Sequence, residues 1–289
     1  MTTLGQWVEG ARPRTLPAAI SPVLVGTGAA IGVDAFLPGR ALLALLVGLA
    51  LQVGVNYAND YSDGIRGTDT DRVGPLRLVG SGAAAPGAVK AAAFGCFAVA
   101  SAGGLVLAAL TSWWLLLVGG LAVAAAWGYT GGKHPYGYRA LGEVSVFVFF
   151  GLVATIGTAY AQAERVLGSA VGGGIATGAL ACAILVANNL RDIPTDELAG
   201  KRTLAVVLGD RRTRTFYGVL VGLAFVVGVA LVAVTPWTLL TLLAAPLALG
   251  PFRAVRTGAG GRALIPVLRD TGRLQLAYAV LLAVGLALG

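Results

Sequence analysis

Charged residues are scarce in this chain of 289 residues. Only 12% of the residues are charged and 57% are hydrophobic, whereas ordinary soluble domains are about 25% charged. The core of a soluble domain of this length has no room for so much apolar surface. The composition therefore excludes an ordinary soluble protein and indicates an integral membrane protein.

Cysteine and histidine are scarcer still. The two cysteines, Cys96 and Cys182, lie inside apolar runs, and His134 is the single histidine. This usage predicts two small buried thiols and no disulfide framework. The same donor set does not predict a zinc site. The first apolar stretch contains Pro17 and Pro22 and leads into further apolar segments, which is not typical of a cleavable signal peptide.

Apolar runs fill most of the chain. Nine of them approach the length of about 20 residues with which a helix crosses a bilayer. They are continuously apolar and do not alternate, so helices are favoured over a β-barrel. The 43 glycines, often in small-xxx-small spacing, suit helices that pack closely in lipid. We predict an all-α integral membrane protein, a single membrane-embedded domain over residues 1–289. The expected spans are 15–33, 41–61, 88–110, 112–130, 141–162, 170–192, 214–234, 236–252 and 272–289.

The distribution of charge predicts the orientation in the membrane. With the N-terminus inside, all of the 21 lysines and arginines except Arg40 and Arg165 fall on the inner side. This positive-inside signal supports an odd number of helices with the C-terminus outside. The net charge of +8 thus indicates an inner membrane surface. Nucleic acid is a poorer partner, because the chain has no basic soluble domain to bind it.

An acidic cluster follows the second apolar run. In NYANDYSDG, Asn56 and Asp60 are four residues apart and Asp63 follows three residues later. Residues with this spacing share one face of a helix. The end of the second helix is therefore expected to present one amide and two carboxylates together.

A second cluster with related spacing follows the sixth apolar run. In NNLRDIPTDELAGKRT, Asn188 and Asp192 are four residues apart, and Asp196 lies one turn further on if Pro194 only kinks the helix. Four helices separate the two clusters, so both emerge on the same side of the membrane. The arrangement resembles a parallel internal repeat.

Carboxylates crowded at two helix ends repel one another and require positive charge between them. Arg191, Lys201 and Arg202 are near in sequence, but carboxylate and amide oxygens are also the ligands of Mg²⁺, which can link carboxylates to a substrate phosphate. The alternative, solvated loop acids that balance nearby basic residues, stays open for Asp69 and Asp71. It is weaker for the four helical acids, because their spacing occurs twice. The predicted metal ligands are Asp60, Asp63, Asp192 and Asp196.

Several motifs together resemble the UbiA superfamily of membrane prenyltransferases over nearly the whole chain. They are GARPRTLPAAISPVLVGTG near the N-terminus, NDYSDG followed by DRVGPLRLVGSG, YTGGKHPYGYRALGE, VFVFFG and VANNLRDIPTDELAGKRTLAVVLG. The combination of NNLRDIPTD with GKRTL is similar to the branch of that superfamily that prenylates 1,4-dihydroxy-2-naphthoate.

The resemblance implies a fold, substrates and a location. The fold would be about nine transmembrane helices around a central cavity that opens to the cytoplasm and sideways to lipid. The substrates would be polyprenyl diphosphate and 1,4-dihydroxy-2-naphthoate, and the products demethylmenaquinol, CO₂ and diphosphate. Mg²⁺ would be the cofactor, with one ion on each acidic cluster. The location would be a bacterial cell membrane, with the N-terminus and the active site on the cytoplasmic side.

The resemblance also implies binding residues. Asn56 and Asn188 would orient ligands or bind phosphate oxygens, and Lys133 or His134, which precede Pro-Tyr-Gly-Tyr, would contact the diphosphate. Asp69 and Asp71 would be lid or phosphate contacts. The cations expected to complete the diphosphate clamp are Arg72, Lys133, Arg139, Arg191 and Lys201. The aromatic rings expected to shield an allylic cation, with an interfacial aromatic belt as the alternative, are Tyr129, Tyr136 and Tyr138.

Two other functions remain as alternatives. A prenyltransferase of the same fold could act on 4-hydroxybenzoate, haem, chlorophyllide or a sugar phosphate. A transporter also keeps charges in membrane helices, but near the midplane and often in inverted repeats, whereas these acids lie at one face. Prenyl chain length and oligomeric state carry no signal in the sequence.

Overall fold

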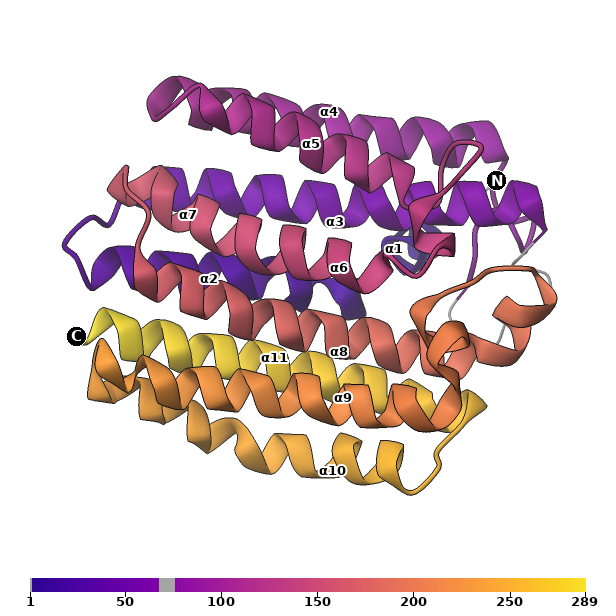
Figure 1. The fold of residues 1–289 in the computed structure, drawn as a ribbon. Helices are drawn as coiled ribbons and strands as arrows, with labels where there is room; N and C mark the ends of the chain where they lie inside the picture. Colours follow the sequence, from indigo (N-terminus) through magenta and orange to yellow (C-terminus); the bar gives the residue numbers. More distant parts are fainter. Residues whose placement is uncertain (1, 68–75) are drawn as a thin grey trace.

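A computed structural model describes residues 2–67 and 76–289, and every regular element in these residues is a helix (Figure 1). The sequence predictions for Asp69, Asp71 and Arg72 lie outside the described residues. The elements are α1 (Leu4–Gly10), η1 (Pro13–Thr15), α2 (Pro17–Ile31), α3 (Pro38–Arg66), α4 (Pro86–Leu110), α5 (Trp114–Gly128), η2 (Tyr136–Tyr138), α6 (Gly142–Val146), η3 (Phe147–Val153), α7 (Ala154–Ala163), α8 (Gly168–Leu198), α9 (Leu204–Ala230), η4 (Leu231–Ala233), η5 (Pro236–Ala244), α10 (Ala245–Arg256), η6 (Gly261–Ala263) and α11 (Leu264–Ala287).

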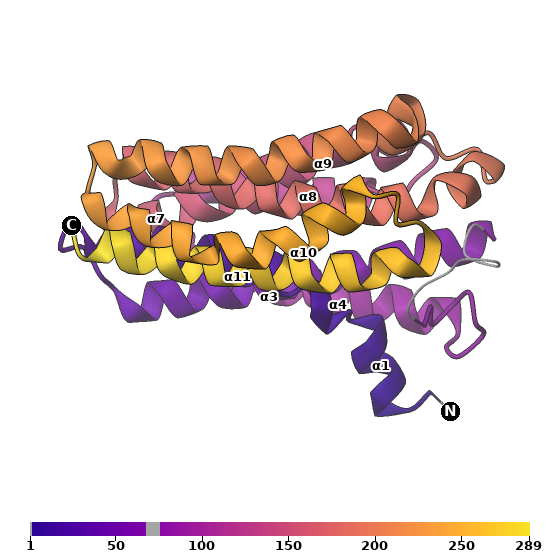
Figure 2. The same ribbon diagram turned by 90° about the horizontal axis from the view of Figure 1, so that it is seen from below.

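The long helices run side by side, and the connecting loops gather at the two ends of the bundle (Figure 1). The two chain termini lie at opposite ends, and α1 projects away from the other helices (Figure 2). Among the six long apolar helices, α8 is the most enclosed, since 72% of its apolar window is buried, against 28–33% in the other five. Side chains of α8 are therefore packed against neighbouring helices on several sides.

Local signals explain where the helices begin and end. A proline in the first turn of a helix removes no hydrogen bond, because the N–H groups there have no partner within the helix. α3 ends at Gly67, whose φ of 72° places it in the left-handed region that glycine adopts readily. The helices that begin with proline are η1, α2, α3, α4 and η5.

The predicted spans correspond to helices, but several helices are longer than their apolar runs. α3 continues to Arg66, α8 continues through Pro194 to Leu198, and α9 begins at Leu204 with a break at Gly209. By length and hydropathy, six helices of the described residues are candidate membrane spans, while α2 and α5 are apolar but shorter. The chain is thus an all-helical protein with six candidate spans, and nine spans stay a prediction.

The apolar core has two parts. One is built around α8 with residues of α2, α7, α9, α10 and α11, and the other around α3 and α4 with one residue of α5. Close helix contact within the first part depends on glycine: a Cβ atom at Gly151 of η3 would lie 2.5 Å from Cα of Gly178 on α8. The cavity described below takes lining residues from helices of both parts.

Candidate functional site

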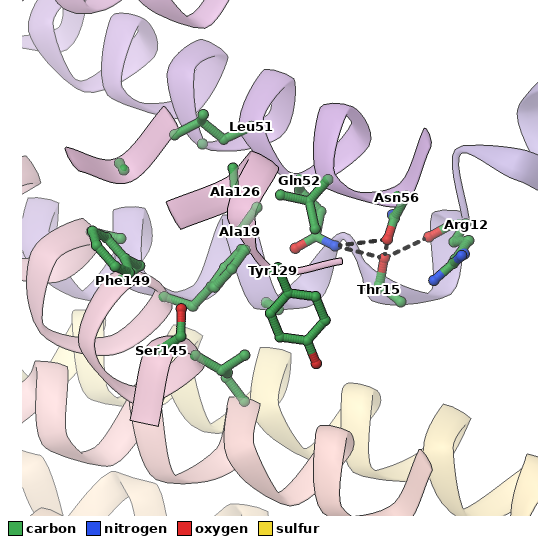
Figure 3. Close-up of a pocket in the computed structure, with 18 of the residues that line it drawn as sticks. Arg12, Thr15, Ala19, Leu51, Gln52, Asn56, Ala126, Tyr129, Ser145 and Phe149 are labelled. Carbon is green, nitrogen blue, oxygen red and sulfur yellow. Dashed lines mark hydrogen bonds between the residues drawn. The ribbon is translucent and has the colours of Figure 1, made fainter. Parts of the chain in front are cut away.

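A cavity of about 800 Å³ is lined by residues of α1 to α8 and α11. Most of its wall is apolar, with side chains such as Leu51, Ala126 and Phe149 (Figure 3). Polar side chains gather on α3 and on the segment before α2. The cavity therefore suits a ligand with a long apolar part and a polar group, which is a common design of small-molecule sites.

Asn56 lies at the polar part of the cavity, in a network that joins α3 to the N-terminal segment (Figure 3). Its Nδ2 donates to the carbonyl of Ala11 at 2.8 Å and to Oγ1 of Thr15 at 3.0 Å. Gln52, one turn earlier, donates to the same Thr15 hydroxyl at 3.1 Å and to Oδ1 of Asn56 at 3.4 Å. Asn56 is thus fixed in orientation and holds residues 11–15 against the cavity.

Asn188 and Arg191 line the same cavity from α8. Arg191 is buried and donates to both carboxylate oxygens of Asp192, from Nε to Oδ1 at 2.7 Å and from Nη2 to Oδ2 at 2.8 Å. Nη2 also donates to Oδ1 of Asn188 at 2.8 Å. A bidentate arginine–carboxylate pair has a defined geometry, so these three side chains form one rigid unit.

Asp60 is fully buried and faces the segment that follows the undescribed residues. Its Oδ2 accepts the backbone N–H of Leu78 at 2.8 Å, and its Oδ1 accepts that of Val79 at 2.9 Å. Hydrogen bonds from two N–H groups stabilise a charged carboxylate. Asp60 therefore anchors residues 78–79 to α3.

Asp63 and Asp196 come together from different helices. The ammonium of Lys201 lies 4.0 Å from Oδ2 of Asp63 and 3.8 Å from Oδ1 of Asp196. The hydroxyl of Tyr138 donates to Oδ1 of Asp63 at 2.7 Å. The two acidic clusters therefore end at the same end of the bundle, and one member of each shares a cation.

The segment 129–139 covers these helix ends and is held by residues that the sequence analysis did not select. Arg66 donates to the carbonyls of Thr130 and Gly132, and its guanidinium carbon lies 5.7 Å from the centre of the Tyr138 ring. Asn59 accepts a hydrogen bond of 2.7 Å from the Thr130 hydroxyl and lines the cavity. Asn59 directly precedes Asp60, so its place beside the acids was a usable signal.

Tyr129 and Tyr136 line the cavity together, with ring centres 5.6 Å apart in an edge-to-face arrangement. The hydroxyl of Tyr136 donates to the carbonyl of Ala125 at 2.7 Å and lies 2.8 Å from Oγ of Ser145. Burial raises the pKa of the Tyr136 phenol, against a lowering by the Ser145 hydrogen bond. Both rings thus present stable neutral aromatic surface to the cavity.

Two of the predicted cations, and the histidine that was the alternative diphosphate contact, lie away from the cavity. Lys133 and Arg139 are exposed, as is His134, and none of the three is a lining residue. Arg139 pairs through its backbone with Arg202, and the N–H of Ala140 donates to the Arg202 carbonyl at 2.9 Å. Contact of Lys133 or His134 with a diphosphate therefore stays a prediction.

Positive charge dominates the polar part of the cavity. Four arginines line it against a single acid, Glu9, and Nη2 of Arg12 is buried without a hydrogen-bond partner in the described residues. An apolar pocket with excess positive charge attracts anions. The four arginines are Arg12, Arg14, Arg77 and Arg191.

The acidic residues have the chemistry of a hard-cation site. Carboxylate and amide oxygens are the preferred ligands of Mg²⁺, and Asp63 and Asp196 already share one cation, the Lys201 ammonium. Across residues 2–67 and 76–289, no three His, Cys, Asp or Glu side chains meet closely enough to hold a metal ion. Asp63 and Asp196 thus have the ligand chemistry of a divalent ion, and these two carboxylates meet around the Lys201 ammonium.

Comparison with known proteins gives consistent results. Residues 19–264 match the model of the UbiA prenyltransferase family. The chain is 57% identical to the 1,4-dihydroxy-2-naphthoate octaprenyltransferase of Mycobacterium tuberculosis over 289 residues, which cover 100% of this chain and 99% of the relative.

Solved structures share the fold. A UbiA homologue from Aeropyrum pernix K1 superposes with a TM-score of 0.70 at 18% identity, covering 93% of this chain and 96% of that one. A UbiA homologue from Archaeoglobus fulgidus, bound to DMAPP and Mg²⁺, superposes with a TM-score of 0.66 at 17% identity, covering 96% and 99% of the two chains.

Proposed function

Because the chain belongs to the UbiA prenyltransferase family, we propose that it transfers a polyprenyl group from polyprenyl diphosphate to 1,4-dihydroxy-2-naphthoate. CO₂ and diphosphate leave, and demethylmenaquinol is formed for menaquinone biosynthesis. The observation that carries this proposal is the match to the Mycobacterium tuberculosis relative along the full length of both chains. The apolar cavity with an arginine-rich polar part suits a prenyl tail joined to an anionic group.

The enzyme is proposed to be one membrane-embedded domain over residues 1–289, with nine spans in a bacterial cell membrane. α2, α5 and α11 would join the six candidate spans. The N-terminus and the acidic helix ends would face the cytoplasm, because the lysines and arginines gather on that side. The cavity would lie centrally and open to the cytoplasm and to lipid, so that a prenyl tail enters from the bilayer.

The four acids would hold Mg²⁺ with the diphosphate. When bound, the ion neutralises the charge that develops on the leaving oxygens. Asp63 and Asp196 already share a cation, whereas Asp192 is held by Arg191 and Asp60 by backbone N–H groups. Asp60 and Asp192 would therefore supply negative charge from fixed positions.

The remaining residues would bind and orient. Asn56 and Asn188 present amides at the cavity wall, and Arg191 and Lys201 would attract the diphosphate. Arg72, Lys133 and Arg139 are proposed to complete the clamp on the diphosphate. The rings of Tyr129, Tyr136 and Tyr138 would shield the allylic cation, since an aromatic face attracts positive charge.

The proposal is tested with the purified chain in detergent, polyprenyl diphosphate, Mg²⁺ and a panel of aromatic acceptors. We expect a prenylated, decarboxylated naphthoquinol with 1,4-dihydroxy-2-naphthoate, detected by mass spectrometry, and no product when Mg²⁺ is chelated. Turnover only with 4-hydroxybenzoate or another acceptor would assign a different branch of the family. No turnover with any acceptor, together with diphosphate-dependent transport in vesicles, would favour a transporter.

A further inference from the structure

Lys201 occupies a position that both acidic helix ends share. Its Nζ lies 4.0 Å from Asp63 on α3 and 3.8 Å from Asp196 on α8. It also lies 5.0 Å from the centre of the Tyr138 ring, whose hydroxyl donates to Asp63. The ammonium is therefore surrounded by two carboxylates and an aromatic face, all of which attract a cation.

The backbone sets Lys201 at this position. Gly200 has a φ of 68° and ends α8 in a tight turn that a residue with a Cβ adopts poorly. The N–H of Lys201 then donates to the carbonyl of Asp196 at 2.8 Å. The turn thus directs the lysine back over the helix end that carries Asp196.

Burial makes a cation necessary here. Only 4% of the Asp63 side chain, 11% of the Asp196 side chain and 16% of the Lys201 side chain are exposed. Two carboxylates that approach one another with so little solvent repel strongly unless a positive charge lies between them. Lys201 supplies that charge from within the chain.

The contacts of Lys201 are looser than those of Arg191. Both of its distances to carboxylate oxygen exceed the 2.7–3.2 Å of a hydrogen bond, whereas Arg191 makes two bonds of 2.7 and 2.8 Å to Asp192. Lys201 therefore interacts by charge, without the directed bonds that lock Arg191. Compared with Arg191, Lys201 is therefore the cation that can be exchanged.

We propose that Lys201 is a built-in cation that holds Asp63 and Asp196 together before substrate arrives, and that a divalent ion brought with the diphosphate takes its place. Lys201 then competes with the ion, so an empty site does not retain metal, and the released ammonium becomes available to the diphosphate. Lys201 is in this sense a positioning residue for the two carboxylates. The link to a diphosphate rests on the proposed function, whereas the competition between Lys201 and the ion is a property of the substrate-free chain.

Mn²⁺ binding to the purified, substrate-free chain tests the competition. We expect Lys201→Met to bind Mn²⁺ about tenfold more tightly than the unaltered chain, because a charge this close to a carboxylate changes its equilibria by about one to three powers of ten. Lys201→Arg keeps the charge and should bind as the unaltered chain does. Lys90→Met is the matched control: it removes the same charge from an exposed residue of α4 that contacts the Tyr61 and Trp127 rings. Affinity of Lys201→Met equal to or weaker than that of Lys90→Met would overturn the proposal.

A second measurement needs no variant and remains valid if Lys201→Met does not fold. An amine-reactive reagent should label Lys201 slowly in the metal-free, substrate-free chain, and several-fold faster when Mn²⁺ is added at a saturating concentration without any diphosphate. Exposed Lys90 on α4, followed in the same digest by mass spectrometry, is the internal reference. An unchanged or lower ratio of Lys201 to Lys90 labelling would contradict the exchange. Both measurements are independent of turnover, so failure to prenylate the naphthoate leaves their outcome interpretable.

Discussion

Asp60 and Asp63 are less than one helical turn apart on α3 and differ in what holds them. Asp60 accepts two backbone N–H groups, whereas Asp63 accepts a tyrosine hydroxyl and lies near Lys201. An amide in place of Asp60 points its NH₂ group at one of those N–H donors, and each lost charged hydrogen bond costs about 1.5–3 kcal/mol. We expect Asp60→Asn to abolish prenyl transfer and also to lower the free energy of unfolding by about 2 kcal/mol. Denaturant unfolding in detergent and the prenyl-transfer assay measure the two effects.

Asp63→Asn should separate the same two effects. It also removes activity, but its amide oxygen still accepts from Tyr138, so stability should change by less than in Asp60→Asn. Glu197→Gln, at an exposed acid of α8, is the control and should alter neither quantity. Equal destabilisation by the Asp60 and Asp63 variants would show that the backbone contacts of Asp60 are not what fixes residues 78–79.

Side chains whose role follows from local spacing could be predicted, and those that depend on distant partners could not. The four-residue interval of Asn56 and Asp60 is visible in the sequence. The bond between Asn56 and Thr15 joins residues 41 positions apart, and no local pattern indicates it. Arg66 was missed for the same reason, since it binds the segment that begins at Thr130, whereas Asn59 stands next to Asp60 in the sequence and could have been selected.

Helix contacts at the element scale depend on where a glycine lies, not only on its presence. A Cβ at Gly151 would meet Gly178 Cα at 2.5 Å and the Gly174 carbonyl at 2.6 Å, both backbone atoms of α8. Gly157 lies on α7, which continues directly from η3, less than two turns after Gly151. A Cβ atom built at Gly157 would have no other atom within 4 Å. We expect Gly151→Ala to cost about 1–3 kcal/mol through overpacking, and Gly157→Ala to be neutral or stabilising. Thermal unfolding of the two variants decides this, and equal melting temperatures would contradict the close contact of η3 with α8.

Arg40 joins three helices at the end of the bundle opposite the acidic clusters. Its Nη1 donates to the carbonyl of Ala161 at 3.0 Å and to Glu164 at 2.7 Å, and its Nη2 donates to the carbonyl of Leu110 at 2.6 Å. These carbonyls end α7 and α4, where a positive charge is favourable. Arg40→Ala should lower stability by about 2–3 kcal/mol.

Glu164→Gln is the control for Arg40. The Glu164 side chain is 58% exposed, and an exposed ion pair contributes about 0–1 kcal/mol, so this variant should lose little stability. If Glu164→Gln lost as much as Arg40→Ala, the ion pair and not the two carbonyl contacts would join the helices. Unfolding of both variants in detergent makes the comparison.

Hydropathy located the helices but not their polar ends. α9 begins ten residues before its predicted span, because Thr203 accepts the N–H of Val206 and caps the first turn, ahead of the polar residues that follow Gly209. α1 was not expected, although Thr3 and Gln6 form a capping box that is a recognised start signal. Pro194 is exposed and α8 continues past it, so Asp192 and Asp196 lie on one helix. Apolar runs report burial in lipid, whereas helix ends are set by caps and loop contacts.

At the scale of the whole molecule, the two ends of the bundle differ in charge. The end that carries the acidic clusters also holds exposed arginines on α9 and α10, which make no ion pair within residues 2–67 and 76–289. They are Arg211, Arg212, Arg253 and Arg256. At the opposite end, Arg40 makes the contacts described above, and Arg165 is exposed. Within the described residues, exposed arginines are therefore more numerous at the end that carries the acidic clusters, where they can bind anionic lipid headgroups, which supports a cytoplasmic location for that end.

This orientation predicts which loops a thiol reagent can reach. Replacing Cys96 and Cys182 by alanine leaves a background for single cysteines at Val166, which is 64% exposed before α8, and at Gly260, which has no atom near a Cβ position before α11. Three membrane crossings lie between these positions, namely α8, α9 and the continuous helix of η5 and α10. The two cysteine positions are therefore expected on opposite sides of the membrane. A membrane-impermeant maleimide added to intact cells should label Val166→Cys but not Gly260→Cys, and inside-out vesicles should reverse the result. Labelling of both from one side would require an even number of crossings, and a reversed pattern would place the acidic clusters outside.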